Sequence, residues 1–546
     1  MAKQVFYDDD ARNRLLGGAK ALYDAVKVTF GPKGRNVVIG KTYGGPTVTH
    51  DGVTVAESID LAEDETTLGY KVGAELIKQA ASKLNKKAGD GTTTVTVLTY
   101  NILAEANKLI AAGYNPQELR LGIEQAGAEV LAELNKMAED VSDKPKKIAE
   151  VATISAGSAE IGKLIADVIA KIGKDGVVTV EAGQGLQMES EVVKGYSFDR
   201  GFVSPFFVTD AARQEAVYDK PAILLTDQKI SNAQEFVPFL ERVATAGKKN
   251  LVIIAEEVDG EALSLLVLNK LKGAFDSVAV KAPAYGDKRK AQLEDIAILT
   301  GATVVSEDYG MTLETADLSV LGSARRIIVG KDSTTIIEGA GAANALASRI
   351  AQVGDLIENA SSEYEKEQLM ARRASLQGKV AVIKVGGTTE TEIDEKKFRV
   401  DDAVAATKAA LADGIVAGGG ITLVDVAKKL KTDGSDPISA GKRILQTALK
   451  QPFLQIMTNG GLNAAALLSK VEASKKVGQG FDVMKPAAEP VDMKTIGVID
   501  PVKVTKEAVA NSVSIAATAI TMGALVVEKP EPKDATPNMG GGMGMM

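Results

Sequence analysis

The chain has 546 residues, of which 45% are apolar and 25% charged, and its formal net charge at pH 7 is −8. This length exceeds one ordinary core and predicts two to four domains of a soluble globular protein. Charges of both signs with a small acidic excess argue against nucleic acid or an anionic membrane as the main partner. With no cysteine and one histidine, disulfides and thiolate chemistry are excluded, and a histidine-based triad or metal site is nearly excluded.

The first ~140 residues have the spacing of long amphipathic helices, with one short hairpin between them. The first helix is predicted from the apolar residues Ala11, Leu15, Leu16, Leu22 and Val26. Strands are predicted at 36–39 and 47–49, separated by the turn residues 44–46. The N-terminal stretch lacks the apolar core of a signal peptide, so a cytoplasmic location is expected.

Residues 88–98, AGDGTTTVTVL, place two glycines around Asp90 and three threonines at the start of a helical pattern. Threonine is a poor helix former, so its threefold use here needs a reason. A glycine-rich turn that opens a helix presents free N–H groups at the positive end of the helix dipole and binds anions. An acid in that turn fits a phosphate if a divalent cation such as Mg²⁺ lies between them. The alternative is an ordinary helix cap, Asp90 or Thr92, followed by surface threonines.

Between about 190 and 330, strand-like runs alternate with helices, which is typical of an α/β domain. The predicted strands are 222–227, 251–258, 277–283 and 303–307. A charged helix at 361–377 is expected to pack one face rather than to form a coiled coil. Alanine- and glycine-rich helices return after about residue 413. This change of pattern along the chain predicts an α/β domain inserted into a helical domain that contains both chain ends.

Residues 508–527 carry no charge over a length that could span a bilayer. Polar residues interrupt this run, so a buried helix is expected instead; they are Asn511, Ser512, Ser514, Thr518 and Thr521. The segment 527–546 is rich in glycine and methionine at its end and is expected to be disordered.

Three other glycine clusters compete as ligand sites. TFGPKGRN (29–36) fits a second loop that approaches a phosphate, or a tight turn. GAGAAN (339–344) follows a strand-like run but has Asn344 where a dinucleotide fingerprint needs a small residue, so that interpretation is disfavoured. AGGG (417–420) fits either a hinge or close packing against a ligand. The Walker pattern GxxxxGK[ST] does not occur.

Three acids and the histidine are further candidates. Asp51 lies on a predicted loop, and Asp401 and Asp402 begin a predicted helix in FRVDDAV. Each of these acids fits an ordinary cap or a solvated side chain as well as a catalytic group. His50 has no second histidine or cysteine with which to share a metal, so an exposed loop residue is the simpler interpretation.

Taken together, these segments resemble the bacterial group I chaperonin family over essentially the whole chain and in the family's order. The matching segments are TFGPKGRNVVIG, PTVTHDGVTVA, AGDGTTTVTVL, KAPAYGDKRKAQLEDIAILTG, AVIKVGG, RVDDAVAATKAAL, GIVAGGG, GVIDPVKV and the Gly/Met tail. The resemblance implies two stacked rings of seven subunits, ATP-driven folding of non-native polypeptides and a small co-chaperonin lid.

The fold implied by the resemblance is a multidomain α + α/β protein. A mainly helical equatorial domain would be built from both chain ends, residues 1–136 and 413–526. A small hinged intermediate domain would comprise 137–193 and 381–412, and the inserted α/β apical domain 194–380. The disordered tail would be 527–546.

The resemblance also implies the residues of an ATPase site. Asp402 and Asp51 would be catalytic, Asp90 would bind Mg²⁺, and the carbonyl groups of Thr29 and His50 would bind K⁺. Thr153 would approach the nucleotide together with its two successors. The ATP-binding residues would be Thr29, Phe30, Gly31, Pro32, His50, Asp90, Gly91, Thr92, Thr93, Thr94, Ile154, Ser155, Gly419, Asp482, Val483 and Asp500.

The sequence departs from the family pattern in three places. The family usually has lysine at the position of His50, which matters little if that residue acts through its carbonyl group. The usual Asn-Ala-Ala is Asp482-Val483-Met484 here, which puts the adenine contacts in question. The usual acid pair before the glycines is Ala412-Asp413, where a surface contact rather than the chemistry is affected.

Two predicted helices, 232–247 and 260–273, carry more apolar surface than one packed stripe requires. The surplus is either buried by a third element or exposed, and an exposed patch marks an interaction site. The resemblance places polypeptide and lid contacts on these segments and on GFVSPFF. The expected residues are Phe202, Phe206, Phe207, Val237, Leu240, Leu263, Val267 and Leu268.

Two rival functions remain open from the sequence. A soluble ATP-dependent phosphotransferase would use the same phosphate loop but would need no apolar polypeptide surface. A chaperonin-like scaffold that has lost turnover is the other rival, and the presence of Asp51, Asp90 and Asp402 argues against that loss.

Overall fold

The computed structural model describes residues 3–40, 46–173, 176–183, 185–210, 213–360 and 362–528. The chain forms two compact units, one from both ends (Met1–Asp167 and Gly387–Met546) and one from the middle (Val168–Gly386). They are called the helical unit and the middle unit below. The prediction of a mixed α and α/β, multidomain protein is confirmed.

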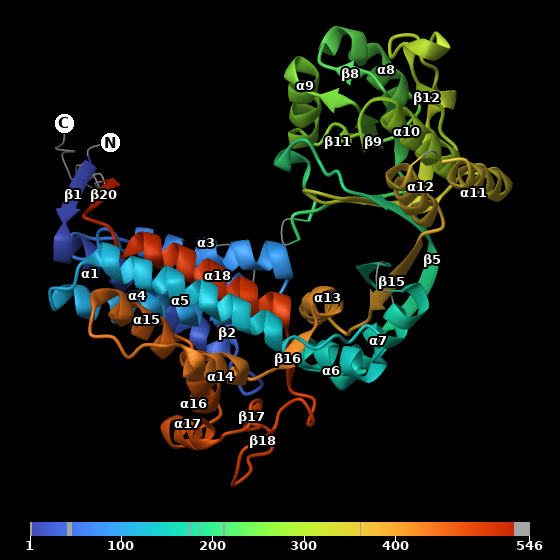
Figure 1. Cartoon of the computed structure of the whole chain (residues 1–546). Helices are drawn as coiled ribbons and strands as arrows, with labels where there is room; N and C mark the ends of the chain where they lie inside the picture. Colours follow the sequence, from blue (N-terminus) through green and yellow to red (C-terminus); the bar gives the residue numbers. More distant parts are fainter. Residues whose placement is uncertain are drawn as a thin grey trace, which may run out of the picture. The chain divides into compact units, whose positions relative to one another are not determined.

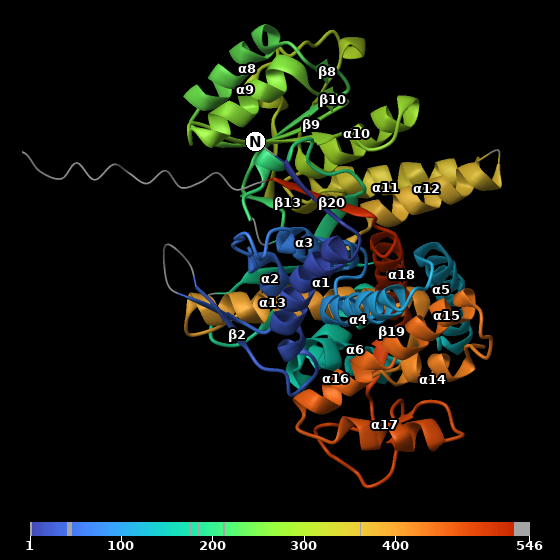
Figure 2. The same ribbon diagram turned by 90° about the vertical axis from the view of Figure 1, so that its left-hand side faces the viewer.

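The helical unit is built around five helices that lie side by side (Figures 1 and 2). They are α1 (Asp8–Val26), α3 (Tyr70–Ala88), α4 (Thr92–Ala111), α5 (Pro116–Met137) and α18 (Val502–Ala519). α18 packs against α3, α4 and α5, and their shared core includes Ile77, Leu98 and Val509. The uncharged run near the C-terminus is therefore a buried helix as far as Ala519. Among the described residues, no helix is both long and apolar enough to cross a membrane.

Smaller helices surround this bundle. They are η1 (Lys27–Thr29), α2 (Gly52–Ser58), α6 (Pro145–Ala156), α13 (Glu390–Asp413), α14 (Ile421–Lys429), α15 (Pro437–Ala448), α16 (Gln451–Asn459) and α17 (Ala464–Ala473). α7 (Ala159–Ile172) begins in the helical unit and ends in the middle unit. α13 packs along α6 and contacts α18 and α3. A segment from late in the sequence therefore lies against α3 and α6, which come early in the sequence.

Four antiparallel strand pairs complete the helical unit. They are β1 (Lys3–Tyr7) with β20 (Ala524–Glu528), β2 (Val37–Ile39) with β3 (Thr47–Thr49), β16 (Ile415–Ala417) with β19 (Ile499–Pro501), and β17 (Gln479–Gly480) with β18 (Val491–Asp492). The β2–β3 hairpin confirms the sequence prediction. Val527 and Glu528 belong to β20, opposite Gln4 and Lys3, so the prediction that disorder begins at 527 is wrong for these two residues. The rest of the predicted tail lies outside the described residues.

The middle unit contains a ten-stranded mixed sheet with the order β11-β9-β7-β13-β14-β5-β15-β4, to which β12 and β6 add beside β7 and β13. The strands are β4 (Val177–Ala182), β5 (Glu189–Phe198), β6 (Ala216–Asp219), β7 (Ala222–Thr226), β9 (Asn250–Ala255), β11 (Asp276–Lys281), β12 (Val304–Val305), β13 (Gly322–Val329), β14 (Thr334–Gly339) and β15 (Lys379–Val385). β7, β9 and β11 are parallel and almost wholly buried, as continuous apolar runs predict. A separate pair joins β8 (Lys229–Ile230) to β10 (Glu257–Val258).

Helices cover both faces of this sheet, and α9 and α10 lie on opposite sides of β9 (Figures 1 and 2). The helices are η2 (Pro205–Phe207), α8 (Ala233–Thr245), α9 (Gly260–Leu271), α10 (Gly286–Thr300), η3 (Glu307–Tyr309), η4 (Leu318–Val320), α11 (Ala343–Glu358) and α12 (Glu363–Leu376). The charged helix α12 packs against α11, and Arg349 and Arg372 from these two helices both bind the buried Asp295 of α10, at 2.7 Å and 2.5 Å. The prediction that this charged stretch packs one face is confirmed.

Candidate nucleotide site and apolar surface

The turn between α3 and α4 combines two left-handed glycines with one acid. Gly89 (φ 68°) ends α3 and Gly91 (φ 87°) begins α4, and residues with a Cβ rarely adopt these conformations. Gly91 provides no side-chain cap, so the first N–H groups of α4 have no acceptor within the helix. The Asp90 carboxylate accepts hydrogen bonds from the Gly91 amide at 2.5 Å and the Ser155 hydroxyl at 3.1 Å. The turn therefore offers backbone donors beside a carboxylate.

The threonines of α4 are part of the packed interior rather than surface residues. Thr92 is buried, and Thr93 and Thr94 are half-buried. A Cβ added to Gly52, the first residue of α2, would stand 2.4 Å from the Thr93 hydroxyl oxygen. Thr92 and Thr93 thus face the start of α2, and the alternative of an Asp90 or Thr92 cap followed by surface threonines is wrong.

Asp51 begins α2 as its N-cap. Its carboxylate accepts hydrogen bonds from the amides of Val53 (3.2 Å) and Thr54 (2.8 Å) and from the Thr54 hydroxyl (2.6 Å). The capping role that the sequence left open is therefore real. A carboxylate has about four acceptor positions, so one remains for a further ligand.

Four carboxylates influence one another within the helical unit. Burial, followed by repulsion from Asp90 and Asp51, raises the pKa of Asp402 on α13 well above its usual range. Burial also raises the pKa of Asp90, with added repulsion from Asp51. Burial and then Asp90 raise the pKa of Asp500 on β19 to about 7. Burial is the largest cause of all three shifts, and repulsion between the acids adds to it.

This group of acids fits a divalent cation that is shared with a bound substrate. Among the residues that the structure describes, no three acids or histidines converge closely enough to hold a metal ion alone. Mg²⁺ is usually held by one or two carboxylates together with phosphate oxygens and water, which is the arrangement this donor set permits. Asp402 accepts no hydrogen bond from the described residues, so its carboxylate is available.

The loop after α1 carries four of the expected ATP-binding residues. Thr29 is buried at the end of η1, Phe30 leaves the helix in an extended conformation, and Gly31 has φ 81°. The side-chain amide of Asn459, at the end of α16, donates to the carbonyl groups of Lys27 (2.8 Å) and Phe30 (2.9 Å). This amide therefore holds both sides of the turn.

His50 lies beside the same loop. A Cβ on Gly34 would stand 2.1 Å from the Thr29 carbonyl oxygen and 2.9 Å from the His50 ring, so both surround Gly34 closely. Burial and then the positive charge of Arg399 lower the pKa of His50, against the opposing effect of Glu395. His50 lies on a loop, as predicted, but it is half-buried, so the prediction that it is exposed is wrong.

A glycine turn and β19 face each other at the start of α14. A Cβ on Gly418 would stand 2.9 Å from the Asp500 carboxylate, and one on Gly419 (φ 66°) would stand 3.3 Å from the Met493 methyl group. Gly420 (φ 77°) then begins α14 without a side-chain cap. The AGGG segment is therefore a tight turn closed against β19.

The remaining expected ATP-binding residues differ in accessibility. Asp482 accepts a hydrogen bond from the Met484 amide at 2.8 Å, and Val483 is buried against Gly460, just after Asn459. On α6, Ile154 is 43% exposed, whereas the Thr153 hydroxyl donates to the Ala149 carbonyl and is thus engaged within its own helix.

Exposed apolar side chains gather on α9 and η2 of the middle unit. Phe206, Leu268 and Leu271 are 61%, 54% and 65% exposed. The neighbouring Phe202, Leu263 and Val267 are half-buried and pack on the core beneath. These six residues are called the α9 surface. On α8, Val237 is also half-buried.

Two residues expected to contact polypeptides are core residues instead. Phe207 has no exposed surface and Leu240 is 9% exposed, so the prediction that they present apolar surface is wrong in this conformation. Leu240 belongs to the same core cluster as Leu313 and Ala316, whose loop is held by Arg242 of α8 through three carbonyl groups. Part of the surplus on α8 is therefore buried, at Leu240, and part stays half-buried, at Val237.

The sequence matches the TCP-1/cpn60 chaperonin family over residues 22–530, almost its whole length. The chain belongs to this chaperonin family. Members of the family are ATPases that form rings, bind unfolded polypeptides and support ATP-dependent protein folding. The turns of the helical unit around Asp51, Asp90 and Asp500, together with Asp402, are thus the candidate site for ATP hydrolysis. The α9 surface of the middle unit is the candidate site for polypeptide binding.

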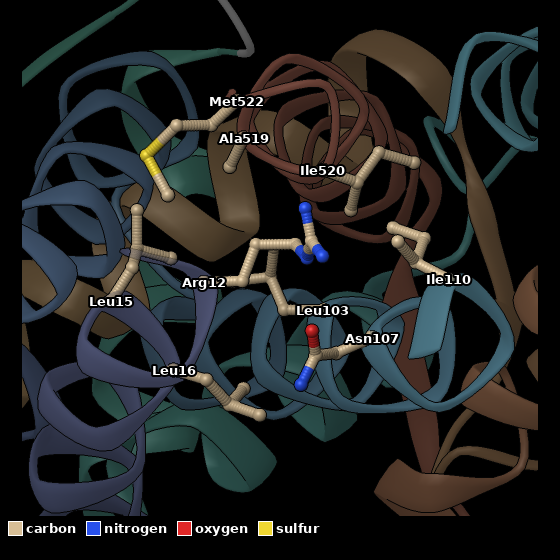
Figure 3. A pocket seen from close by; sticks show the side chains of 9 residues that line it. All are labelled: Arg12, Leu15, Leu16, Leu103, Asn107, Ile110, Ala519, Ile520 and Met522. Atoms are coloured by element: carbon tan, nitrogen blue, oxygen red, sulfur yellow. The ribbon is translucent and has the colours of Figure 1, made fainter. Parts of the chain in front are cut away.

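A small pocket in this chaperonin lies elsewhere, between α1, α4 and the end of α18 (Figure 3). Apolar side chains surround the guanidinium of Arg12, which pairs with Asp9 and whose Nε has no hydrogen-bond partner among the described residues. None of the expected ATP-binding residues lines this pocket. The candidate nucleotide site is defined by its turns and acids, which lie apart from this pocket.

Asn459 is the site residue that sequence reasoning missed. Its role depends on contacts with a loop about 430 residues earlier in the chain, which no local pattern reveals. The following Gly460-Gly461 pair was the available signal, since a glycine just past a helix end often adopts the left-handed conformation, as Gly461 does (φ 73°).

Proposed function

We propose that this chaperonin is a group I type that captures non-native polypeptides on the α9 surface and encloses them beneath a small co-chaperonin lid. Two stacked rings of seven subunits would form the chamber, and ATP hydrolysis in the helical unit would drive the cycle. The observation that carries the proposal is the uncapped start of α4 beside the Asp90 carboxylate, which also accepts a hydrogen bond from Ser155.

The α3–α4 turn would bind the phosphates of ATP. The N–H groups of Thr92, Thr93 and Thr94 begin α4, and left-handed Gly91 lets the backbone approach the phosphates closely. Asp90 would hold Mg²⁺, and the carbonyl groups of Thr29 and His50 would hold K⁺. When bound, Mg²⁺ neutralises phosphate charge and lowers the pKa of neighbouring acids.

Three other turns would close around the rest of the nucleotide. The loop Thr29–Pro32 would line one side, Gly419 and Asp500 another, and Asp482 and Val483 would lie near the base. Ile154 and Ser155 would approach from α6, and the hydrogen bond from Ser155 to Asp90 supports that position.

Asp402 would accept the proton of the attacking water. Phosphoryl transfer to water depends mainly on alignment and charge neutralisation, so one positioned base suffices. Asp402 is suited because its carboxylate makes no hydrogen bond to the described residues and because its raised pKa makes it a stronger base. Asp51, whose position is fixed because it caps α2, would assist hydrolysis near the bound ions.

The proposed domains are finer than the two compact units. The equatorial domain would be 1–136 with 413–526, the intermediate domain 137–193 with 381–412, and the apical domain 194–380. α13 would then belong to the intermediate domain, so a hinge movement would carry Asp402 toward bound ATP.

The test combines imaging with capture of an unfolded polypeptide. Electron microscopy with ATP should show sevenfold double rings, and Phe206→Ser should weaken capture at least about tenfold while rings persist. A small acceptor phosphorylated by a monomer would instead support a phosphotransferase, and rings without ATP turnover would support a scaffold. Leu356→Ser, which changes a half-exposed leucine of α11, is the control and should capture normally.

A further inference from the structure

Lys270, near the end of α9, turns into the protein rather than toward solvent. Its ammonium group donates to the Phe207 carbonyl oxygen at 2.7 Å and to the Tyr218 hydroxyl at 2.9 Å. The Tyr218 hydroxyl in turn donates to the Ser277 carbonyl oxygen of β11 at 2.9 Å. A chain of hydrogen bonds therefore runs from β11 through Tyr218 and Lys270 to η2.

Two consecutive residues of η2 have opposite environments. The Phe207 ring is fully buried, whereas Phe206 is 61% exposed. η2 has three residues, and the one side-chain bond at its start, from the Phe206 amide to the Ser204 hydroxyl, is long at 3.4 Å. Two backbone hydrogen bonds of 3.2 Å also hold η2, from the Phe207 amide to Ser204 and from the Val208 amide to Pro205. Lys270 adds the charged hydrogen bond to the Phe207 carbonyl group, and the direction in which Phe206 projects depends on how firmly this backbone is held.

The inward position of Lys270 also removes a charge from the α9 surface. Lysine usually extends its ammonium group into water along an apolar face. Here the flanking Leu268 and Leu271 are more than half exposed, so an outward ammonium group would stand between them. Burial lowers the pKa of Lys270, and Asp276 opposes this shift. Neutral oxygen atoms hold the ammonium group, and no ion pair to it exists among the described residues.

We propose that Lys270, supported by Tyr218, is a positioning residue for polypeptide capture: it fixes η2 so that Phe206 joins Leu268 in one apolar patch. This inference rests on the proposed function of the α9 surface. Lys270 itself does not contact the polypeptide, so its effect should pass entirely through Phe206.

The first test measures the affinity for a reduced and alkylated, permanently unfolded polypeptide that carries a fluorophore. Lys270→Met should weaken binding about tenfold, the scale of a lost hydrogen bond from a charged donor. Lys270→Arg keeps the donors and should bind within about twofold of wild type. The matched control is Lys248→Met, which removes an exposed lysine outside α9 and should leave binding unchanged. Equal binding by Lys270→Met and wild type would overturn the inference.

A double-mutant cycle separates positioning from a general loss of structure. In a Phe206→Ala background, Lys270→Met should weaken binding by less than about twofold, because the residue that it positions is already absent. An undiminished effect in that background would refute the inference. No effect of Phe206→Ala alone would refute instead the proposed function of the α9 surface.

The chain has no tryptophan, so Phe206→Trp introduces a unique fluorescent reporter on η2. Adding Lys270→Met or Tyr218→Phe should shift its emission and lower its anisotropy, because η2 is then released. This measurement needs neither ATP nor a polypeptide, so it tests the tether even if capture fails. An unchanged emission and anisotropy in both variants would contradict a positioning role.

Discussion

Asp402 is the residue whose replacement should separate nucleotide binding from hydrolysis. Its carboxylate has no hydrogen-bond partner among the described residues and is repelled by Asp90 and Asp51. Asp402→Ala should therefore bind ATP at least as well as wild type but hydrolyse it at least ~100-fold more slowly, the usual scale for a positioned proton acceptor. Calorimetry and phosphate release measure the two quantities. Asp401→Ala is the control, since adjacent helix residues point about 100° apart and turnover should persist.

Asp500 should make stability depend on pH in the nucleotide-free protein. Its pKa of about 7 lies above the ordinary value of 3.8, so the folded state holds the proton over a range in which the unfolded state releases it. The contribution of Asp500 to the free energy of unfolding therefore falls as pH rises from about 4 to about 7. Asp500→Asn removes this dependence.

The melting temperature of Asp500→Asn relative to wild type should therefore increase between pH 4 and pH 7 and level off above. Each kcal/mol of stabilisation corresponds to about 2–4 °C in a domain of about 150–250 residues and to less in a larger unit. A difference that stays constant across that range would show that Asp500 does not titrate there.

Asn459 should act on nucleotide affinity through the loop that it holds. Asn459→Asp keeps the shape but places acceptors against the Lys27 and Phe30 carbonyl groups, which removes two hydrogen bonds. ATP binding should weaken about tenfold, since each bond contributes about 0.5–1.5 kcal/mol. Binding should recover partly at low pH, where the new carboxyl group of the Asn459→Asp variant is protonated and can donate once.

Asn463→Asp is the matched control for that change. Asn463 caps α17 by accepting from the Ala466 amide, and aspartate caps a helix equally well. Its ATP affinity should equal that of wild type. Equal affinities for both aspartate variants would show that Asn459 does not position the loop.

At the scale of elements, the start of α4 depends on Gly91. Gly91→Ala forces a left-handed alanine, which costs about 1–2 kcal/mol, and sets its Cβ 2.6 Å from a Val504 methyl group, which adds about 1–3 kcal/mol. Gly113→Ala, just after α4, has φ 95° and open space around its Cβ. It therefore carries the backbone cost alone.

Chemical denaturation of both variants compares these costs. Gly91→Ala should lose clearly more unfolding free energy than Gly113→Ala and should also lose ATP affinity, which Gly113→Ala keeps. Equal destabilisation would mean that α18 moves away freely at Val504. Tight packing of α18 against α3, α4 and α5 argues against such movement.

Elements whose pattern is local were predictable from the sequence. The buried parallel strands β7, β9 and β11 appear as apolar runs, and α1, α4 and α12 follow helical spacing. The fate of the surplus apolar surface on α8 was not predictable. Leu240 is buried and Val237 half-buried, and the loop that Arg242 holds against α8 comes about 70 residues later in the chain.

The candidate site shows the same division between local and distant information. Glycines that need positive φ, such as Gly91 and Gly419, were recognisable because few other residues fit such turns. The N-cap role of Asp51 was recognisable as one of two alternatives. The hydrogen bonds of Asn459 and the inward position of Lys270 depend on contacts between distant segments. The spacing of apolar residues therefore cannot predict them.

At the scale of the whole molecule, the sequence predicted that two separate chain segments form the helical unit. The pattern changes from helical to alternating strands and helices after about residue 190, and it is helical again after about residue 413. Residues Val168–Gly386 form one compact unit, and both flanking segments form the other. The reason is physical: α18 completes the core of α3, α4 and α5, so neither flanking segment buries its apolar faces alone.

This arrangement imposes an order on biosynthesis. α3, α4 and α5 leave the ribosome early, but α18 begins at Val502, about 335 residues after the first segment ends. At ~5–20 residues per second, the early helices wait on the order of 20–70 s for the partner that covers them. The middle unit is continuous in sequence and can fold during that interval. A nascent chaperonin thus exposes, for a time, the kind of apolar surface that its family binds on other proteins.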